Sequence, residues 1–325
     1  MRVVVVALDR CLGSGLIGLA DILASANQTL RLMGRTESML EVVVASQDGR
    51  PVLDGAGRRH EVDASLQELD ECTAAIVPGF MPDEAGRLPA MSDYSIAANW
   101  LRARHRHGAL VAGSCSGVFV LGEAGLLNDL KCTTTWWLHD QLAQVCPKAN
   151  IMRGAPLTEE NRIVTVGGPV SWIDIALHVI GKVAGADAAR AAADFAIVDT
   201  TPSAQAAYIP TGFSLTGDPF VGEAERIVRH AGERGMTARL LAQELKVSER
   251  TLHRRLSNAC GETPKDFIDR VRLETAKISL ETTSKSIREV AQNVGYGDEA
   301  SFRRSFKRVF GLTPGAYRST IGRNR

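Results

Sequence analysis

The chain has 325 residues, enough for two to three domains that bury cores of their own without disulfide or metal support. Its net charge of +1 conceals a division. Residues 219–325 carry 21 Lys and Arg against 13 Asp and Glu, whereas residues 1–218 carry 17 against 24. Segments of charge +8 and −7 indicate that one part of the chain meets a polyanion and the other does not.

The cysteines and the amino-terminal residues argue against several classes of protein. No C-x-x-C pair and no zinc-like spacing of Cys and His occur, so we expect reduced thiols, no metal, no cofactor and a cytoplasmic location. The apolar run at residues 3–8 is far shorter than the ~20 residues of a membrane span. Nucleic acid is therefore the expected partner of the basic segment, and a membrane is not.

The first part of the chain alternates strand and helix patterns. Short β-branched runs predict buried strands at residues 3–8, 41–45, 74–77, 109–112 and 163–166. Between them, helical spacing places residues 16, 19, 20, 23 and 27 on one face, and Ile96, Trp100 and Leu101 on another. A long helix follows Ser171 over residues 172–183. This alternation predicts a mostly parallel sheet covered by helices on both faces.

Residues 200–220 interrupt every periodic pattern with Pro, Gly, Ser and Thr. We therefore predict a domain at residues 1–199, a linker at 200–220 and a second domain at 221–325. Beyond the linker every segment reads as helix or tight turn.

The second domain contains an internal repeat. The segment Gly261-Glu262-Thr263-Pro264 recurs as Gly311-Leu312-Thr313-Pro314, a shift of 50 residues. Each copy reads as helix, turn, helix. In the first copy, one helix covers residues 238–245 and a second, capped by Ser248, runs to residue 259. In the second copy, one helix covers residues 287–294 and a second, capped by Asp298, runs to residue 310. A helix at 270–282, with Leu273, Ala276 and Leu280 inward, separates the copies.

Residues 219–318 resemble the DNA-binding domain of the AraC/XylS family of transcription regulators. The resemblance implies that the second helix of each copy enters one of two successive major-groove segments, about 34 Å apart. The residues expected at base edges are Arg250, His253, Arg254, Glu299, Arg303 and Arg304. Arg255, Lys307 and Arg308 are expected at phosphates, where contacts position the protein without specifying sequence.

One cysteine of the first domain lies at a sharp turn from strand to helix. Small residues flank Cys115 in Gly113-Ser114-Cys115-Ser116-Gly117, the logic of a nucleophile elbow. A thiol at a helix N-terminus is expected to favour the thiolate.

This elbow resembles the ThiJ/PfpI family, within the class I glutamine amidotransferase-like superfamily. Val77-Pro78-Gly79 and the segments 121–127 and 172–178 fit the same family, so the resemblance covers residues 1–190. Together with the second domain it is typical of GlxA-type regulators of the AraC family. It implies a flavodoxin-like α/β doubly wound sandwich that senses a small molecule and helps the protein to form a homodimer.

Catalysis by Cys115 would need a proton-transfer partner. The family pattern places His 20 residues after the cysteine, where this chain has Thr135, and an early Glu, where it has Gly13-Ser14-Gly15. His139 is a weak substitute. Three roles for Cys115 are therefore open. It is a nucleophile, a packed structural residue, or a residue that lines a ligand pocket and can be oxidised. We place it in the pocket with Gly79, Phe80, Thr135 and Trp136, and a Trp there could stack on a cation.

The sequence as a whole predicts a sequence-specific transcription regulator, an activator, whose catalytically inactive first domain binds a small metabolite near Cys115. Its expected partners are operator DNA, the effector and a second copy, with RNA polymerase as a further candidate. The alternatives are an active cysteine hydrolase or glyoxalase-like enzyme fused to a DNA-binding domain, and a first domain that only dimerises.

Overall fold

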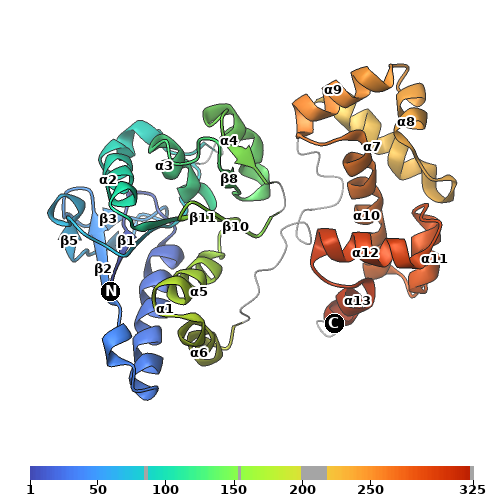
Figure 1. Ribbon diagram of the computed structural model, residues 1–325. Coiled ribbons are helices and arrows are strands. Elements are labelled where there is room, and N and C mark those ends of the chain that lie inside the picture. Colours follow the sequence, from blue (N-terminus) through green and yellow to red (C-terminus); the bar gives the residue numbers. More distant parts are fainter. Residues whose placement is uncertain (84–86, 153–154, 199–217, 323–325) are drawn as a thin grey trace. The chain divides into compact units, whose positions relative to one another are not determined.

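The computed structural model describes residues 1–83, 87–152, 155–198 and 218–322 (Figure 1). The chain divides into two compact units, Met1–Gln205 and Ala206–Arg325. The predicted linker lies outside the described residues as far as position 217. Helix α7 (Pro219–Ala231) begins inside the predicted linker, two residues before the predicted start of the second domain.

A seven-stranded sheet forms the centre of the first unit, in the order β10-β11-β7-β6-β1-β2-β5. Every pairing is parallel except that of β10 with β11. The five predicted strands are confirmed to within two residues at either end, whereas β5 and β10 were not predicted. The strands are β1 (Arg2–Val6), β2 (Glu41–Ser46), β5 (Ala64–Ser65), β6 (Ala74–Val77), β7 (Leu110–Ser114), β10 (Leu157–Glu160) and β11 (Ile163–Val166).

Helices cover both faces of this sheet (Figure 1). Helices α1 (Gly13–Leu32), α5 (Trp172–Val183) and α6 (Ala186–Ala196) pack together on one face. Helices α2 (Ser95–Arg106) and α3 (Val118–Glu123) lie on the other, and α4 (His139–Val145) follows. The first unit is therefore a flavodoxin-like α/β sandwich, as predicted.

The predicted inward face of α2 is wrong at one position. Ile96 is 43% exposed, whereas Ala97, Ala98 and Leu101 are buried. The small alanines let the helix approach the sheet along their side, which leaves the larger Ile96 at the edge of the contact.

The order of the strands reverses beside β1. The chain pairs β2 with one side of β1 and then crosses to pair β6 with the other side. In open parallel sheets ligands bind outside the carboxyl ends of the strands at such a point. The segments that follow β1, β6 and β7 meet there, and so does the ladder of β3 (Val52–Leu53) with β4 (Arg59–His60). A second small ladder joins β8 (Lys131–Cys132) and β9 (Asn150–Ile151).

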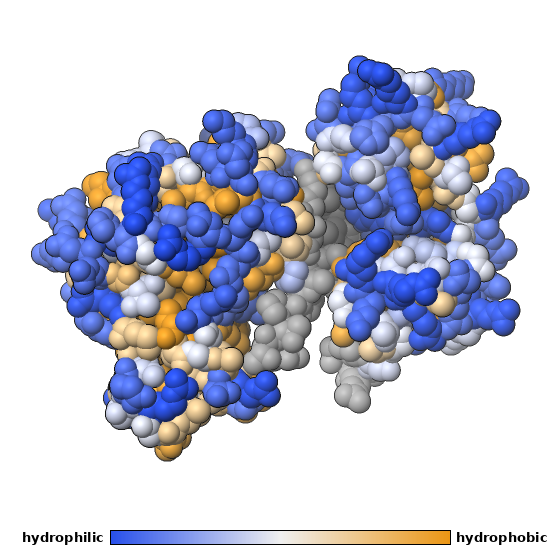
Figure 2. Space-filling view, viewed as in Figure 1, coloured by the Kyte–Doolittle hydropathy of each residue, from blue (hydrophilic) through white to orange (hydrophobic). Residues whose placement is uncertain are grey.

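The second unit consists of helices around two small cores. Helix α10 (Pro264–Thr282) contacts the helices of both cores, and it begins six residues before its predicted start. Ion pairs join α10 to α7, since Arg270 of α10 contacts Glu225 of α7 at 3.3 Å and Arg229 of α7 contacts Glu274 of α10 at 2.9 Å. Hydrophilic residues cover most of the visible face of this unit in Figure 2. Its helices besides α7 and α10 are α8 (Ala238–Glu244), α9 (Glu249–Cys260), α11 (Ile287–Asn293), α12 (Glu299–Phe310) and α13 (Pro314–Gly322).

Within the described residues, no helix is both long enough and apolar enough to span a bilayer.

Candidate functional site

The first helix-turn-helix unit consists of α8 and α9. The Ser248 hydroxyl accepts a hydrogen bond from the Thr251 backbone N–H at 3.1 Å, which caps α9 as predicted. Gly261 ends the helix at φ +68°, in the left-handed conformation that favours glycine. Leu252 and Leu256 are fully buried. The inward side of α9 is thereby fixed, and its polar side faces solvent.

The residues predicted to read bases from α9 lie on that polar side. Arg250, His253 and Arg254 are all exposed. Arg250 and Arg254, one helical turn apart, make no hydrogen bond or ion pair within the described residues, whereas His253 Nδ1 lies 3.4 Å from the Ser257 hydroxyl. Both guanidiniums are therefore available to an outside partner.

The second unit, α11 and α12, presents its predicted readers differently. Asp298 caps α12 by accepting the Ser301 backbone N–H at 2.7 Å, and this bond lowers the pKa of the Asp298 carboxyl. Glu299 and Arg303 form an ion pair with 2.7 Å between Oε1 and Nε, and Arg304 donates to the Ser301 hydroxyl at 2.9 Å. The readers of α12 are thus held in place by neighbours on their own helix.

The residues predicted to contact phosphate fall into two groups. Lys307 and Arg308 are exposed in the last turns of α12. The guanidinium of Arg255 instead lies 3.8 Å from the centre of the Phe220 ring, and its Nη2 is 3.9 Å from Asp218 Oδ1. A phosphate contact of Arg255 would therefore compete with contacts to the first turn of α7.

Within the second compact unit, helix α10 links the two helix-turn-helix units. Arg272 of α10 donates to the Val294 carbonyl oxygen in the turn between α11 and α12, and its guanidinium lies 4.5 Å from the Tyr296 ring centre. In the same turn Gly295 has a φ of +79°, and a Cβ there would lie 2.8 Å from the Gly235 Cα. Gly235 precedes α8, so the backbones of the two units touch at this junction.

In the first unit of the chain, Cys115 sits at a strained turn. It follows β7 with a φ of +53°, which non-glycine residues rarely adopt, and it is 4% exposed. Its carbonyl oxygen accepts a hydrogen bond from the Thr134 hydroxyl at 2.7 Å. A Cβ at Gly117 would lie 2.4 Å from the Pro78 carbonyl oxygen, which explains the small residue there. The predicted elbow is confirmed.

The predicted thiolate is wrong. Burial raises the pKa of the Cys115 thiol to about 11, and hydrogen bonding to Ser116 offsets only part of this effect. The turn after Cys115 is a short 3-10 helix, and α3 spans only Val118–Glu123, so the helix dipole is weak here. The thiol stays protonated at neutral pH.

The family places a His and a Glu beside the cysteine, and the corresponding positions here, residue 135 and residues 13–15, carry neither a base nor an acid. Thr135 is buried, and its hydroxyl has no hydrogen-bond partner within the described residues. His139 begins α4, and its Nε2 lies 3.0 Å from the Thr134 carbonyl oxygen. At the start of α1, a Cβ at Gly15 would lie 3.7 Å from the Trp172 ring, and one at Gly18 within 2.4 Å of that ring. The indole of Trp172 covers this stretch.

Of the residues predicted to bind a ligand, Gly79 and Phe80 lie beside the elbow. Gly79 lies against Cys115, since a Cβ on Gly79 would be 3.0 Å from the Cys115 Cβ. The Ser116 hydroxyl accepts from the Phe80 backbone N–H at 2.6 Å. Thr135 leads into the turn that carries Trp136, whose ring meets Trp137 edge-on at 5.0 Å.

Sequence reasoning missed a buried carboxylate beside this region. Asp54 accepts from His60 Nε2 at 3.0 Å and from Arg58 Nε at 2.9 Å, and these bonds, the one to His60 foremost, hold its pKa well below the ordinary value. A Cβ at Gly13 would lie 2.4 Å from Asp54 Oδ2, so the hairpin of β3 and β4 packs closely on the start of α1. The Asp-Gly turn signal at Asp54-Gly55 was visible in the sequence, but its burial was not.

The comparisons with known proteins agree with this geometry. Residues 1–182 match the DJ-1/PfpI family, and the chain belongs to this family. Residues 241–320 match a helix-turn-helix domain. The chain is 28% identical to the HTH-type transcriptional regulator CdhR of Pseudomonas aeruginosa, with 91% of this chain and 87% of that protein aligned. It is 29% identical to the HTH-type transcriptional regulator GlxA of Rhizobium meliloti, with 92% of each chain aligned.

Among solved structures, a ThiJ/PfpI family protein from Pseudomonas syringae shares the fold with a TM-score of 0.51 and 18% identity, covering 83% of this chain and 90% of that one. The predicted combination of a DJ-1/PfpI domain and an AraC-type helix-turn-helix domain is confirmed. The protein is a DNA-binding transcription regulator.

Proposed function

We propose that this regulator binds a small metabolite in its DJ-1/PfpI unit, and that the bound metabolite changes the affinity of the helical unit for an operator. It acts as an activator, as a homodimer, with RNA polymerase as a further partner. A ligand shifts such an equilibrium only through different affinities for two states of the protein. The observation that carries the proposal is that one chain combines an elbow with no proton-transfer partner among its described residues and two helices with exposed polar faces.

The DNA-reading part of the proposal rests on the surfaces of α9 and α12. Arg250, Arg254 and Arg304 are suited to guanine, whose O6 and N7 accept bidentate bonds from arginine, and Glu299 is suited to cytosine N4. Arg303 and His253 complete the base-reading set. Lys307 and Arg308 serve phosphates, and Arg255 joins them if DNA displaces its contacts with α7.

The sensing part rests on the chemistry of the elbow. A thiol whose pKa is raised to about 11 supplies almost no thiolate at neutral pH, and nucleophilic catalysis by cysteine needs the thiolate. This favours a binding role for Cys115 and its neighbours over the hydrolase alternative, and we assign no enzymatic activity to the unit.

The test begins with selection of the operator from random duplexes and with mass spectrometry of metabolites that purify with the full chain. We expect a recovered metabolite to change operator affinity at least tenfold without being turned over. Turnover that Cys115→Ala abolishes would establish the enzyme instead. If no recovered metabolite alters the affinity for the operator, the DJ-1/PfpI unit would serve only for dimerisation.

Three variants test the reading residues. Arg254→Ala and Arg304→Ala should each lose about 1–3 kcal/mol on the operator but little on random DNA, because they remove base contacts. Lys307→Ala, also on α12, is the matched comparison. It should weaken both duplexes alike and reduce the dependence of log K on log salt by about one unit. Equal losses on both duplexes for Arg254→Ala would reassign that residue to phosphate.

A further inference from the structure

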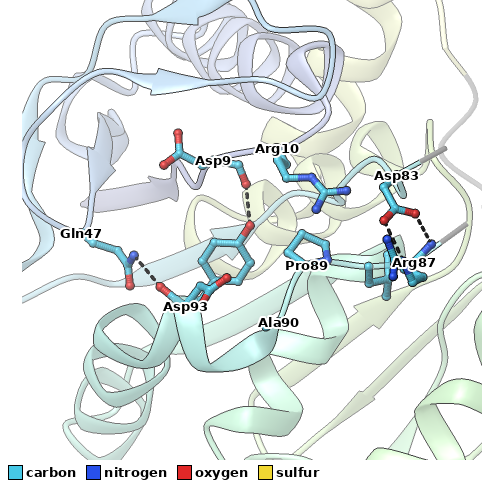
Figure 3. A pocket seen from close by; sticks show the side chains of 10 residues that line it. Asp9, Arg10, Gln47, Asp83, Arg87, Pro89, Ala90 and Asp93 are labelled. Atoms are coloured by element: carbon cyan, nitrogen blue, oxygen red, sulfur yellow. Dashed lines mark hydrogen bonds and ion pairs between the residues drawn. The ribbon is translucent and has the colours of Figure 1, made fainter. Parts of the chain in front are cut away.

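A cavity of about 410 Å³ lies in the first unit at the carboxyl ends of β1 and β2 (Figure 3). Its walls come from the residues after β1, the residue after β2 and the segment that leads into α2. Cavities of this size hold small metabolites, and the position beside β1 is where the strand order reverses. None of the residues predicted to bind a ligand lines this cavity.

Arg10 is forced to face this cavity by its backbone. Its N–H donates to the Leu53 carbonyl oxygen at 2.7 Å, and its own carbonyl oxygen accepts from the Met81 N–H at 3.0 Å. These bonds to β3 and to the segment after β6 hold Arg10 at φ +66°, a conformation that is strained for any residue with a Cβ. Figure 3 shows the guanidinium of Arg10 pointing into the cavity, near Pro89.

The charge of Arg10 is not neutralised inside the protein. Its guanidinium makes one long hydrogen bond, from Nη2 to the Met81 carbonyl oxygen at 3.3 Å, and no ion pair within the described residues. The other arginine of the wall, Arg87, is paired with Asp83 at 2.9 Å. One unpaired cation in a partly enclosed cavity is a site for one carboxylate, since a doubly charged phosphate would call for more cations.

Acidic groups stand in the same wall. The Asp93 carboxylate makes no hydrogen bond or ion pair within the described residues, and the Asp9 carboxylate accepts only the Leu53 backbone N–H, at 2.9 Å. A second negative charge on a ligand would lie near these two exposed carboxylates, and like charges at short range repel. The Tyr94 ring and Pro89 add an apolar surface between the charged groups.

We propose that this cavity binds a small monocarboxylate, with its carboxylate on Arg10 and its uncharged or cationic end toward Asp9 and Asp93. The site connects to the elbow through buried side chains. Tyr94 donates from its hydroxyl to the Asp9 carbonyl oxygen at 2.6 Å and stacks on Phe80 at 4.9 Å, and Phe80 is hydrogen-bonded to Ser116. The proposal rests on the sensing function only for the effect of the ligand on DNA.

The test uses three four-carbon acids that differ at the far end: butyrate, 4-aminobutyrate and succinate. Calorimetry on the full-length protein should show that butyrate and 4-aminobutyrate bind, and that succinate binds at least tenfold more weakly. Arg10→Gly should weaken both monocarboxylates at least tenfold, and Asp93→Asn should reduce the discrimination against succinate. Because glycine accepts φ +66°, Arg10→Gly should leave the melting temperature unchanged or higher, so lost binding cannot be ascribed to unfolding.

Arg162→Gly is the matched control. Arg162 is also an arginine at positive φ, +60°, but it is exposed and does not line the cavity, so its variant should bind like the wild type. Four results would each overturn the site. They are equal binding by Arg10→Gly and the wild type, binding of succinate as tight as that of the monocarboxylates, loss of binding in Arg162→Gly, and no binding of any acid to the wild type. Acids that bind through Arg10 without altering operator affinity would leave the site standing and count against the sensing function.

Discussion

At the scale of single residues, buried carboxylates link segments of the fold, Asp54 in the hairpin of β3 and β4 and Glu225 and Glu274 on α7 and α10. Asp54 is the clearest case, because its fully buried carboxylate receives four hydrogen bonds, from His60, from Arg58 twice and from the Ala56 backbone. Those donors come from the hairpin of β3 and β4, so one side chain closes the hairpin. The carboxylate is therefore a structural group, although it lies at the edge of the sheet where ligands bind.

We expect Asp54→Asn to lower the free energy of unfolding by about 1–3 kcal/mol at pH 7, because an amide NH₂ would face buried donors. A folded-state pKa below the ordinary value means that the stabilisation is present above the unfolded pKa of about 3.9 and is lost as pH falls through the folded pKa. The loss caused by the substitution should therefore shrink between pH 4 and pH 2, as measured by urea unfolding.

The control for Asp54 is Asp48→Asn. Asp48 and its partner Arg50 are both largely exposed, so the change should cost less than about 0.5 kcal/mol at any pH. A penalty for Asp54→Asn that stays constant down to pH 2 would show that the charge of Asp54 does not stabilise the hairpin.

At the scale of elements, the two helix-turn-helix units approach each other most closely where Gly295 meets the segment before α8. A Cβ at Gly295 would lie within 3.0 Å of the Gly235 Cα, the Gly232 carbonyl oxygen and the Arg272 guanidinium, and two of these three are backbone that cannot move aside. Since α9 and α12 are fixed to opposite sides of this junction, we infer that the distance between the two DNA segments is set here.

Gly295→Ala should destabilise the helical unit by about 1–3 kcal/mol, from the positive φ and the close contacts. In the wild type, one base pair inserted between the two operator segments should lower the affinity for the operator. In Gly295→Ala this loss of affinity should be smaller. Binding titrations with normal and lengthened operators measure this. Gly297→Ala, in the same turn but with no atom within 4 Å of its Cβ position, should behave as wild type. An unchanged response to the insertion would place the spacing control elsewhere.

The elements that the sequence predicted well are those whose signal is local. Buried β-branched runs located five strands, and Ser248 and Asp298 located the starts of both recognition helices, because a cap bonds to a residue three positions on. β10 was missed since Thr158, Glu159 and Glu160 give an edge strand no apolar signal. Thr263 as a cap and Pro264 in the first turn are signals for the early start of α10, which was predicted at residue 270.

The site was predictable only in part, for the same reason. The predicted readers on α9 and α12 follow from the resemblance to the AraC/XylS family, whereas the ion pair of Glu299 with Arg303 needed a choice of rotamers. The raised pKa of Cys115 depends on burial by segments distant in sequence. Arg10 gave no signal at all, because the bonds that turn it into the cavity come from Leu53 and Met81, more than 40 residues away.

At the scale of the whole molecule, each unit has its own hydrophobic core and its own charge. The core of the first unit is built from residues before position 194, and those of the second from residues after position 220. The second unit carries the charge of +8 and the first that of −7. Units with separate cores unfold separately unless their interface is large and apolar, so a ligand of one need not stabilise the other.

We therefore expect calorimetric unfolding of the full chain to show two transitions that respond to different ligands. Operator DNA should raise one of them, and the increase should fall as salt increases, because DNA binding releases counterions from the duplex. A monocarboxylate at 100 times its Kd should raise the other by the equivalent of about 2.7 kcal/mol. Arg10→Gly should abolish only the second effect and Arg254→Ala should weaken only the first. A single transition that both ligands raise together would instead mean that the two units unfold as one body, and coupling between effector and operator would then pass through a shared core.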